Sequence, residues 1–362
     1  MKKKIIFFSG SRADFDLIKP IYELVKRNKK YNTNLLISGT NLDKKYNEES
    51  IDILNNNFLR LKVNLKSSNK KYFSKIFSQY FFNFFNFLIK FKPSLIVLLG
   101  DRYEVLALSI AAKFLNCKVI HLHGGETTKG SLDDVWRNVI SVLSDFHFTS
   151  INIYKEKVKK ITGYNHNVYN LGSIGAYNVK NIKQKIIFNK KYSKKILVSY
   201  HSATNSIPQS RKDFLELLKA LSRFKNFLIF FTYPGHDIDS DFLIKKISTF
   251  KKENKNVIFV KKVKKYSYGV LLNSFDILVG NSSAGIIEAP SARIPSLNIG
   301  NRQMGRVSGP SVFNTLGNNK FIFKKINFIL NKKKINFHNP YYKKNILNNM
   351  YNKIIKIIKN LD

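Results

Sequence analysis

Short hydrophobic runs recur along the whole chain, and longer segments with helical spacing separate them. The runs are KIIFFS, TNLLIS, SLIVLLG, CKVIHLH and FHFTS in the first half, and KKILVSY, NFLIFFT, NVIFV, FDILVG and IPSLNIG in the second. Their apolar positions are continuous, which is typical of parallel strands that helices cover on both faces. The pattern predicts an α/β protein with two doubly wound domains.

The length supports two domains, because 362 residues exceed what one hydrophobic core usually holds. The polar stretch NVKNIKQKIIFNKKYSKK, residues 178–195, separates the two series of runs and is the best candidate linker. We predict one domain over residues 1–178 and a second over residues 179–339.

An aromatic segment, YFSKIFSQYFFNFFNFLIKF, covers residues 72–91. Its polar residues recur at spacings of 4, 4, 3 and 4, namely Lys75, Gln79, Asn83, Asn86 and Lys90. This spacing predicts an amphipathic helix packed on a core and not a membrane span. Attachment to a membrane surface is the less favoured alternative, and we predict no membrane partner.

The chain is strongly basic, with 63 Lys and Arg against 23 Asp and Glu and a net charge of +40. Lysines occur in pairs and triplets from Lys2 to Lys359, mixed with Asn, and no stripe combines Arg with aromatic residues. We therefore predict no nucleic-acid partner and relate the charge to solubility and to anionic substrates.

One cysteine, Cys117, excludes an internal disulfide and favours a reducing compartment. The N-terminus MKKKIIFFSGSR has only four apolar residues before Ser9, which is too short for the apolar part of a signal peptide. We predict a first strand there and a cytoplasmic protein.

Loops that follow the predicted strands carry most of the chemically distinctive residues. These loops are SGSRADF, GDRYE, HGGETTKGSLDD, HSATNS and NSSAGIIEAP. Ligands of doubly wound sheets bind beyond the carboxyl ends of the strands, where loops enter helices. The sequence therefore predicts a ligand cleft between the two domains.

Small and polar residues in GNSSAGIIEAP suit a diphosphate. Backbone N–H groups near Asn281 and Gly285, with the hydroxyls of Ser282 and Ser283, would donate to it, and Glu288 would accept from ribose hydroxyls. A plain helix cap at Asn281 or Ser282 is the alternative. No GxGxxG or GxxxxGK[ST] motif occurs, so we predict no cofactor.

Four arginines in strand-end loops stand out because Arg is scarce beside Lys: Arg12, Arg102, Arg302 and Arg306. Their planar donors suit diphosphate oxygens, although ordinary surface arginine is the alternative for each.

Four carboxylates lie on the strand-end loops of the first half: Asp101, Glu126, Asp133 and Asp134. Carboxylates that are gathered or buried can exchange protons near neutral pH, and His201 is predicted to face the same cleft. Asp133 or Asp134 would equally serve as a helix cap. We predict no metal site, because His121 and His123 alternate on a strand and no further ligand spacing supports them.

Several motifs, taken in order from residue 9 to residue 306, resemble one family. They are SGSRADFDLIKP, GDRYEVLALSIAA, HLHGGETTKGSLDDVWRNVIS, HFTS, LGSIG and GNSSAGIIEAPSARIPSLNIGNRQMGR. They resemble the hydrolysing UDP-N-acetylglucosamine 2-epimerases of sialic and legionaminic acid pathways. The resemblance implies a glycosyltransferase-B-like fold with two Rossmann-like domains, in which a C-terminal helix within residues 340–362 returns to the first domain.

The resemblance also implies the reaction, in which a proton is removed at sugar C2, the nucleoside diphosphate is eliminated and water adds to the glycal. Asp101, Glu126 and Asp133 or Asp134 match acid–base carboxylates of the family, and His201 matches a histidine that opens the second domain. Arg12, Ser282, Ser283 and Glu288 match diphosphate and ribose contacts. The chain departs from the family pattern at Asn138 and Ile287, where His and Arg are usual, and at Ser202, where Pro is usual.

His123 and the loop GGETTKG resemble the branch that acts on UDP- or GDP-N,N'-diacetylbacillosamine. Members that act on UDP-N-acetylglucosamine, which release N-acetylmannosamine, tend to carry Glu at the position of His123 and are the first alternative. A glycosyltransferase of the same fold and a non-catalytic nucleotide-sugar sensor are two others. We expect a homo-oligomer, either a dimer or a tetramer.

Overall fold

The computed structural model describes residues 2–43, 57–65, 70–188, 192–234, 237–260 and 267–361. The chain divides into two compact units. Unit 1 comprises Met1–Glu126, Asp133–Ile174 and Lys343–Asp362, and unit 2 comprises Thr127–Leu132 and Gly175–Tyr342.

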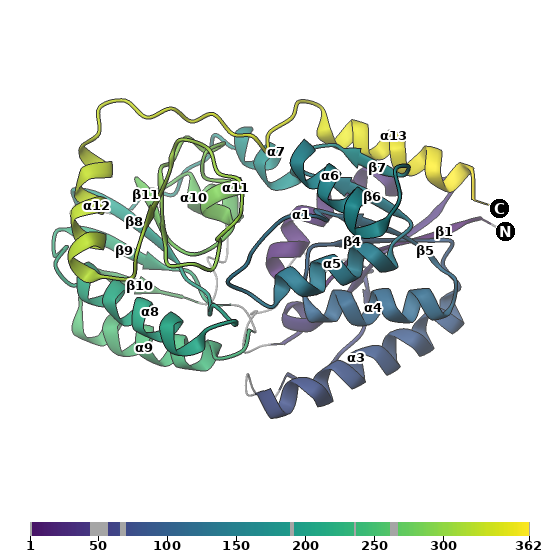
Figure 1. Ribbon diagram of the computed structural model, residues 1–362, viewed down its shortest axis with the longest axis horizontal. Helices are drawn as coiled ribbons and strands as arrows, with labels where there is room; N and C mark the ends of the chain where they lie inside the picture. Colours follow the sequence, from purple (N-terminus) through teal and green to yellow (C-terminus); the bar gives the residue numbers. More distant parts are fainter. Residues whose placement is uncertain are drawn as a thin grey trace. The chain divides into compact units, whose positions relative to one another are not determined.

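Unit 1 is built on a sheet of seven parallel strands in the order β3-β2-β1-β4-β5-β6-β7 (Figure 1). The central strands β1, β4 and β5 consist mainly of Ile, Leu, Val and Phe, and apart from Lys4 and Lys118 at their amino ends their residues are buried. The strands are β1 Lys4–Ser9, β2 Asn32–Ile37, β3 Leu59–Arg60, β4 Leu95–Leu99, β5 Lys118–Leu122, β6 Phe146–Thr149 and β7 Val168–Asn170.

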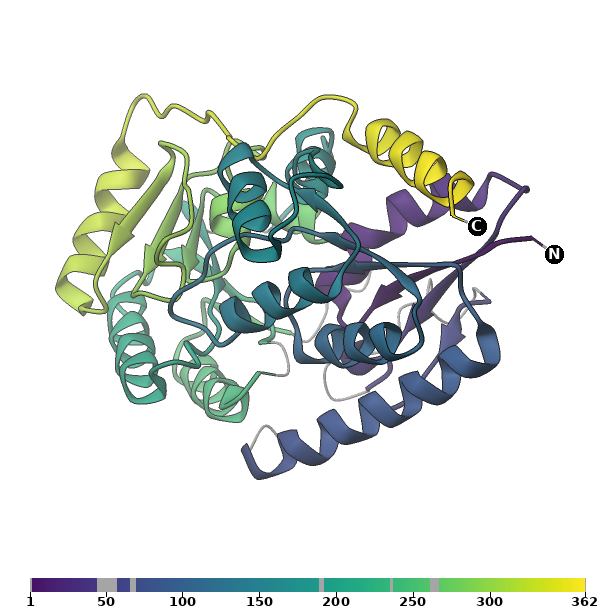
Figure 2. The same ribbon diagram turned by 45° about the vertical axis from the view of Figure 1, so that its right-hand side comes forward.

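Helices cover both faces of this sheet, as the continuous hydrophobic runs require. α3, α4 and α5 pack in sequence beside one another, whereas the C-terminal helix α13 packs on α1 (Figure 2). The helices are α1 Arg12–Lys26, the 3₁₀ turn η1 Gly39–Asn41, α3 Lys70–Phe91, α4 Tyr103–Phe114, α5 Asp133–Leu143, α6 Asn152–Thr162 and α13 Ile346–Lys359.

Unit 2 repeats the scheme with six parallel strands in the order β10-β9-β8-β11-β12-β13. Its main core joins β8, β9 and β11 to α8, α9 and α12. The strands are β8 Lys194–Ser199, β9 Phe227–Phe231, β10 Val257–Phe259, β11 Ile277–Gly280, β12 Ser296–Ile299 and β13 Val312–Thr315. The helices are α8 Ile207–Leu221, α9 Ser240–Glu253, α10 Tyr268–Leu272, α11 Ala284–Ile287 and α12 Asn319–Asn331, while α7 Ile174–Lys180 carries the chain from unit 1 into unit 2.

The predicted fold class is confirmed, since all ten hydrophobic runs form strands of two parallel sheets. The amphipathic segment also forms a helix, α3, whose side chains Ile76, Tyr80, Phe84 and Leu88 are buried. Within the described residues, no helix combines the length and the apolar character needed to cross a membrane.

The division of the chain differs from the predicted boundaries in three places. The chain passes from unit 1 to unit 2 between Ile174 and Gly175, instead of between residues 178 and 179. It returns to unit 1 between Tyr342 and Lys343, instead of between residues 339 and 340. The loop Thr127–Leu132, predicted within the first domain, belongs to unit 2. There the Lys129 N–H donates to the Met304 carbonyl at 3.1 Å, and the Leu132 N–H donates to Thr204 Oγ1 at 2.8 Å.

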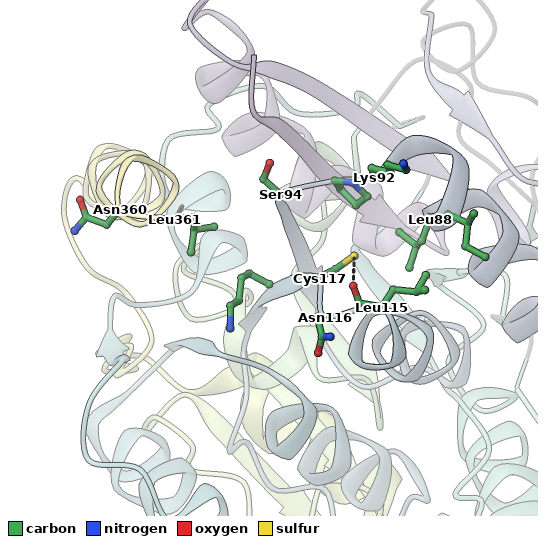
Figure 3. Close-up of a pocket in the computed structure, with 11 residues that line it drawn as sticks. Leu88, Lys92, Ser94, Leu115, Asn116, Cys117, Asn360 and Leu361 are labelled. Carbon is green, nitrogen blue, oxygen red and sulfur yellow. Dashed lines mark hydrogen bonds between the residues drawn. The ribbon is translucent and has the colours of Figure 1, made fainter. Parts of the chain in front are cut away.

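A cavity of about 730 Å³ lies at the amino ends of β4 and β5, the edge of the unit 1 sheet opposite to the strand-end loops (Figure 3). Leu88, Lys92, Cys117 and Asn360 contribute to its lining. Burial raises the pKa of the Cys117 thiol, which disfavours the thiolate form. None of the predicted site residues lines this cavity.

Candidate active site

Both sheets place predicted site residues at the point where the strand order reverses. In unit 1 the reversal lies between β1 and β4, so the loops that carry Arg12 and Asp101 leave the sheet there. In unit 2 it lies between β8 and β11, which are followed by His201 and Asn281. Ligand sites of doubly wound sheets lie at such reversals.

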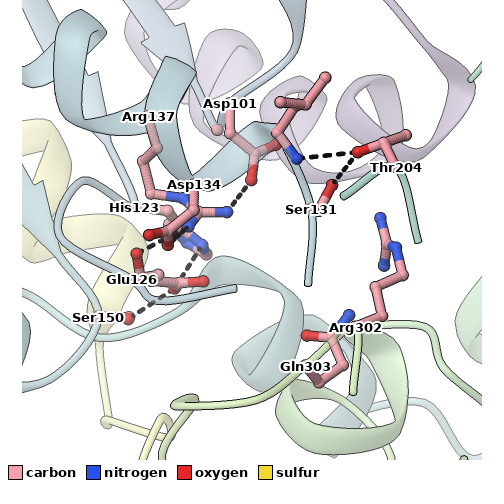
Figure 4. Close-up of polar contacts among 12 residues, drawn as sticks. Asp101, His123, Glu126, Ser131, Asp134, Arg137, Ser150, Thr204, Arg302 and Gln303 are labelled. Carbon is pink, nitrogen blue, oxygen red and sulfur yellow. Dashed lines mark hydrogen bonds and ion pairs between the residues drawn. The ribbon is translucent and has the colours of Figure 1, made fainter. Parts of the chain in front are cut away.

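A buried arginine, Arg137 on α5, connects the carboxylate loops of unit 1 (Figure 4). Its Nη1 donates to the Glu126 carbonyl oxygen at 2.7 Å and lies 3.4 Å from Asp134 Oδ1. Its Nη2 donates to Asp101 Oδ2. One guanidinium thus contacts two loops and the first turn of α5. It faces two carboxylates, Asp101 and Asp134, whose side chains are 25% and 20% exposed.

The two aspartates at the start of α5 are both in its first turn. Asp134 lies one helical turn before Arg137, which explains their contact. Asp133 is half-buried beside it. The structure therefore brings Asp101 and Asp134 together on one cation.

Glu126 forms a second group with Ser150 and His123 (Figure 4). Ser150 Oγ donates to Glu126 Oε1 at 2.8 Å, and His123 Nδ1 lies 3.3 Å from the same oxygen. Ser150 follows β6, whereas His123 and Glu126 follow β5, so the loops after two neighbouring strands meet in this group.

His121 on β5 connects the backbone before Asp101 to helix α5. Its Nε2 lies 2.7 Å from the Gly100 carbonyl oxygen, and its Nδ1 lies 3.0 Å from Ser141 Oγ. A carbonyl only accepts, so Nε2 carries the proton and Nδ1 accepts from the Ser141 hydroxyl. Burial lowers the pKa of His121 to about 4, and the ring is neutral at pH 7.

Gly124 fits against the same histidine. A Cβ on Gly124 would lie 2.8 Å from Ser141 Oγ and 3.1 Å from His121 Nδ1, so no larger residue fits there. The predicted absence of a metal site at His121 and His123 remains a prediction.

The predicted anion ligand Arg102 is paired inside unit 1. Its Nε donates to Glu104 Oε1 at 2.5 Å, and Glu104 is buried. Burial raises the pKa of the neighbouring Asp14 to about 6, with Arg102 acting in the opposite direction. Arg12 begins α1, and its side chain lies outside the described part of the chain.

In unit 2, the side chain of Asn281 clamps His201 by bonding both of its backbone polar groups. Its Oδ1 accepts from the His201 N–H at 2.7 Å, and its Nδ2 donates to the His201 carbonyl at 2.8 Å. The His201 ring lies 3.5 Å from Asp237 Oδ2 and is 23% exposed. Because its amide is occupied, Asn281 positions the histidine loop of the unit.

The predicted diphosphate loop enters a helix of one turn only, α11, with four residues. Ser282 Oγ accepts from the Ala284 N–H at 3.3 Å, and Ser283 occupies the N-cap position without a capping hydrogen bond from its side chain. Gly285 lies against Ser296, where a Cβ would meet the Ser296 side chain at 3.3 Å. Gly285 therefore permits close packing of α11 on β12, and Glu288 follows at the C-cap.

Arg302 and Gln303 both donate to the Asn281 carbonyl oxygen, from Nη1 at 3.2 Å and from Nε2 at 2.8 Å. The loop Thr127–Leu132 lies against the same region of unit 2, since a Cβ on Gly130 would meet the Arg302 Cα at 2.5 Å. Arg302 thus belongs to the loop cluster of unit 2 that also includes His201 and Asn281.

Sequence reasoning did not single out Arg137, Ser150, Thr204 or Gln303. Arg137 carried one available signal, because an arginine three residues after Asp134 lies on the same helix face. The other three depend on contacts between distant segments.

The comparisons with known proteins agree with this architecture. The sequence matches the family described as UDP-N-acetylglucosamine 2-epimerase over residues 23–359. It is 31% identical to the polysialic acid biosynthesis protein P7 of Escherichia coli, covering 99% of this chain and 94% of that protein. It is 28% identical to the GDP/UDP-N,N'-diacetylbacillosamine 2-epimerase (hydrolyzing) of Campylobacter jejuni, covering 87% of this chain and 84% of that protein.

Among solved structures, the UDP-GlcNAc 2-epimerase of Neisseria meningitidis bound to UDP-GlcNAc has the same fold, with a TM-score of 0.78 and 18% identity over 98% of this chain and 100% of that chain. This structural likeness covers both units and confirms the predicted glycosyltransferase-B-like fold class. The family match covers most of the chain, and this protein therefore belongs to the UDP-N-acetylglucosamine 2-epimerase family of enzymes.

Proposed function

We propose that this enzyme is a hydrolysing 2-epimerase of UDP- or GDP-N,N'-diacetylbacillosamine. It releases the nucleoside diphosphate and the free sugar with inverted C2. The observation that carries the proposal is the carboxylate cluster of unit 1, in which Arg137 holds Asp101 and Asp134 at the edge of the sheet. The similarity to the Campylobacter jejuni enzyme supports the substrate class.

The chemistry requires such a cluster. Elimination removes the C2 proton while the C1–O bond breaks, and the electron pair of that bond leaves on the diphosphate. Water then adds to C1 of the glycal and a proton returns to C2. Partly exposed carboxylates beside a fixed cation can exchange these protons without leaving an unpaired buried charge. Asp101, Glu126 and Asp133 or Asp134 are assigned to this acid–base work.

Unit 2 is assigned to the nucleoside diphosphate. The hydroxyls of Ser282 and Ser283 and the guanidinium of Arg302 supply donors for phosphate oxygens, and Glu288 is assigned to the ribose. His201 is assigned to acid–base work from the loop that Asn281 clamps. In unit 1, Arg12 and Arg102 are assigned as further anion ligands.

The sugar is proposed to carry a 4-acetamido group and to lack a 6-hydroxyl. His123 stands where members that act on UDP-N-acetylglucosamine tend to carry Glu, and imidazole is a weaker acceptor for sugar hydroxyls than a carboxylate is. A substrate with an amide and a methyl group does not need that acceptor. No cofactor is required by this chemistry.

The proposal is tested by incubating the protein with UDP-N,N'-diacetylbacillosamine, its GDP counterpart and UDP-N-acetylglucosamine, without an acceptor and in deuterium oxide. We expect nucleoside diphosphate release from a diacetylbacillosamine substrate, and deuterium at C2 of the free sugar. A clear preference for UDP-N-acetylglucosamine would reassign the substrate. Release that needs an added acceptor would indicate a glycosyltransferase.

The variant Asp101→Asn tests the carboxylate assignment. It keeps the size of the side chain and its contact with Arg137, but it removes basicity. We expect turnover to fall by roughly 100- to 10,000-fold while the protein stays folded. Turnover close to that of the wild type would make Asp101 a structural residue.

We further propose a homo-oligomer in the cytoplasm. The cytoplasmic assignment rests on the single cysteine. The oligomer rests on an apolar outer face of unit 1, defined by Phe82 on α3, Phe114 on α4 and Val139 on α5, which are 65%, 70% and 38% exposed. We assign a second copy of the chain to this face.

A further inference from the structure

His123 has a left-handed backbone conformation, which is uncommon for residues other than glycine. It follows β5 directly and has φ +64°, in the left-handed region that favours glycine. Its N–H donates to the Phe148 carbonyl at 2.8 Å, which fixes the bend to the neighbouring strand. Strained residues of this kind persist where the surroundings enforce them, and they gather at functional sites.

The bend brings the imidazole to Glu126. Nδ1 lies 3.3 Å from Glu126 Oε1, and the Glu126 side chain is only 3% exposed (Figure 4). Ser150 Oγ donates to the same oxygen. Glu126 is therefore enclosed, unlike Asp101 and Asp134. Its carboxylate contacts the His123 imidazole and is poorly placed to touch an incoming ligand directly.

The contact with Glu126 determines which nitrogen of the His123 imidazole carries the proton. An ionised carboxylate only accepts hydrogen bonds, so Nδ1 carries the proton. In the neutral ring Nε2 then holds a free electron pair. Among the described residues, Nε2 is buried and has no hydrogen-bond partner. A buried acceptor without a donor is unfavourable, and such an atom is retained where a ligand completes it.

We propose that Glu126 acts through His123, and that Nε2 of His123 is the atom that takes the C2 proton of the sugar. The inference rests on the proposed function. The C2–H electron pair becomes the C1=C2 double bond, the C1–O pair leaves with the nucleoside diphosphate, and the proton ends on Nε2. Glu126 then takes part in the proposed acid–base work through the imidazole of His123 and not by touching the sugar. As a positioning residue it holds the tautomer and stabilises the imidazolium, as the carboxylate of a hydrolase triad does.

The inversion at C2 of the sugar fits an arrangement with two acid–base groups in unit 1. A proton that leaves one face of the sugar and returns on the opposite face needs two separate acid–base groups. Unit 1 has two, the Glu126–His123 pair and the Asp101–Asp134 pair on Arg137. Because Nε2 is covered by its neighbours, these neighbours must move when substrate binds.

The first test measures the tautomer and needs no activity. Histidine labelled with ¹⁵N in the whole protein is observed by NMR at pH 7.5, and His123→Gln assigns the signal. We expect a proton on Nδ1 and none on Nε2. A proton on Nε2 overturns the proposal, even if the enzyme acts on the proposed substrates.

The second test is kinetic and uses His123→Gln, Glu126→Gln and the double variant. We expect each single variant to lose roughly 100- to 10,000-fold in kcat, and the double variant to lose no more than His123→Gln alone, because the two residues act as one unit. Losses that multiply, or a kcat of His123→Gln within tenfold of wild type, overturn the proposal. His166→Gln, at an exposed histidine of unit 1, is the matched control and should keep full activity.

A substrate with deuterium at C2 separates a catalytic from a structural role. In His123→Gln the isotope effect on kcat should rise above the wild-type value, because proton removal becomes rate-limiting. An isotope effect that does not rise overturns the proposal. If the wild-type protein releases no nucleoside diphosphate from any of the three substrates, the proposed function fails, and the NMR result still decides the state of His123.

Discussion

A single buried arginine, Arg137, holds the carboxylate loops of unit 1 in place. Its fork of donors reaches Asp101, Asp134 and the Glu126 backbone at once. A lysine ammonium is a point charge and cannot span the three acceptors. We expect Arg137→Lys to lower kcat by roughly 100-fold or more while the protein remains folded, as measured by nucleoside diphosphate release.

The matched control for that variant is Arg211→Lys. Arg211 makes two hydrogen bonds to Asp239 but its side chain is 47% exposed. Exposed ion pairs contribute little, so the same replacement should change kcat less than twofold. Equal effects at both positions would show that Arg137 has no special role.

Asn281 gives a second prediction for a single residue. In Asn281→Asp the carboxylate still accepts from the His201 N–H but faces the His201 carbonyl without a donor. We expect the free energy of unfolding to fall by about 1 to 3 kcal/mol, and kcat to fall as the His201 loop shifts. Urea denaturation and turnover measure the two effects. An unchanged stability would contradict the clamp.

At the scale of elements, the neighbouring strands β5 and β6 place two buried histidines side by side, His121 and His147. Burial lowers the pKa of His121 to about 4 and that of His147 to about 3. The unfolded chain takes up these protons near pH 6.5, and the folded chain does not. The stability contributed by both rings is therefore complete above pH 6.5 and is lost as the pH falls toward 4.

Asp14 on α1 has the opposite effect on the pH dependence of stability. Burial raises its pKa to about 6, so the folded chain keeps a proton that the unfolded chain releases between pH 3.8 and 6. Urea denaturation at pH 7.5, 6 and 5 should show a net loss of stability on acidification, because two histidines outweigh one carboxyl. His147→Phe should reduce the slope by up to about 1.4 kcal/mol per pH unit. A slope equal to that of the wild type would exclude His147 as a source.

The same scale shows why the sequence predicted part of the structure. Ten strands were predictable because their apolar runs are continuous. β3, β7 and β13 were not, because they have two to four residues and contain polar positions such as Asn170 and Asn314. Edge strands need less hydrophobic character, so the signal is weak there.

The candidate site divides in the same way. The strand-end rule selected the loops of Asp101, Glu126 and His201. It did not select Ser150, which reaches Glu126 across 24 residues of sequence. No local pattern encodes such a contact, and the pairing of Arg137 with Asp101 across 36 residues is of the same kind.

For the whole molecule, the outer face of α3, α4 and α5 predicts self-association. The sequence has no charged residue between Lys75 and Lys90, although the chain has a net charge of +40. Exposed apolar side chains of this kind suit a second identical surface related by a twofold axis. We expect the double variant Phe82→Glu and Phe114→Glu to be a monomer by light scattering, where the wild type is a dimer or tetramer.

The control for that variant is Phe321→Glu on α12 in unit 2, where Phe321 is 56% exposed. It adds the same charge to a different helix and should leave the oligomer intact. A wild type that is monomeric at micromolar concentration would contradict the assignment of this face.

The loop Thr127–Leu132 makes the two units inseparable as pieces of sequence. The chain enters unit 2 after Glu126, returns at Asp133, enters again after Ile174 and returns at Lys343. A gene fusion that exchanges only Gly175–Tyr342 for the corresponding segment of a relative would leave this chain's own six-residue loop, Thr127–Leu132, against a foreign unit 2. Chimeras of this chain should therefore function only when the loop Thr127–Leu132 is exchanged together with Gly175–Tyr342, so two separate segments have to be transferred at once.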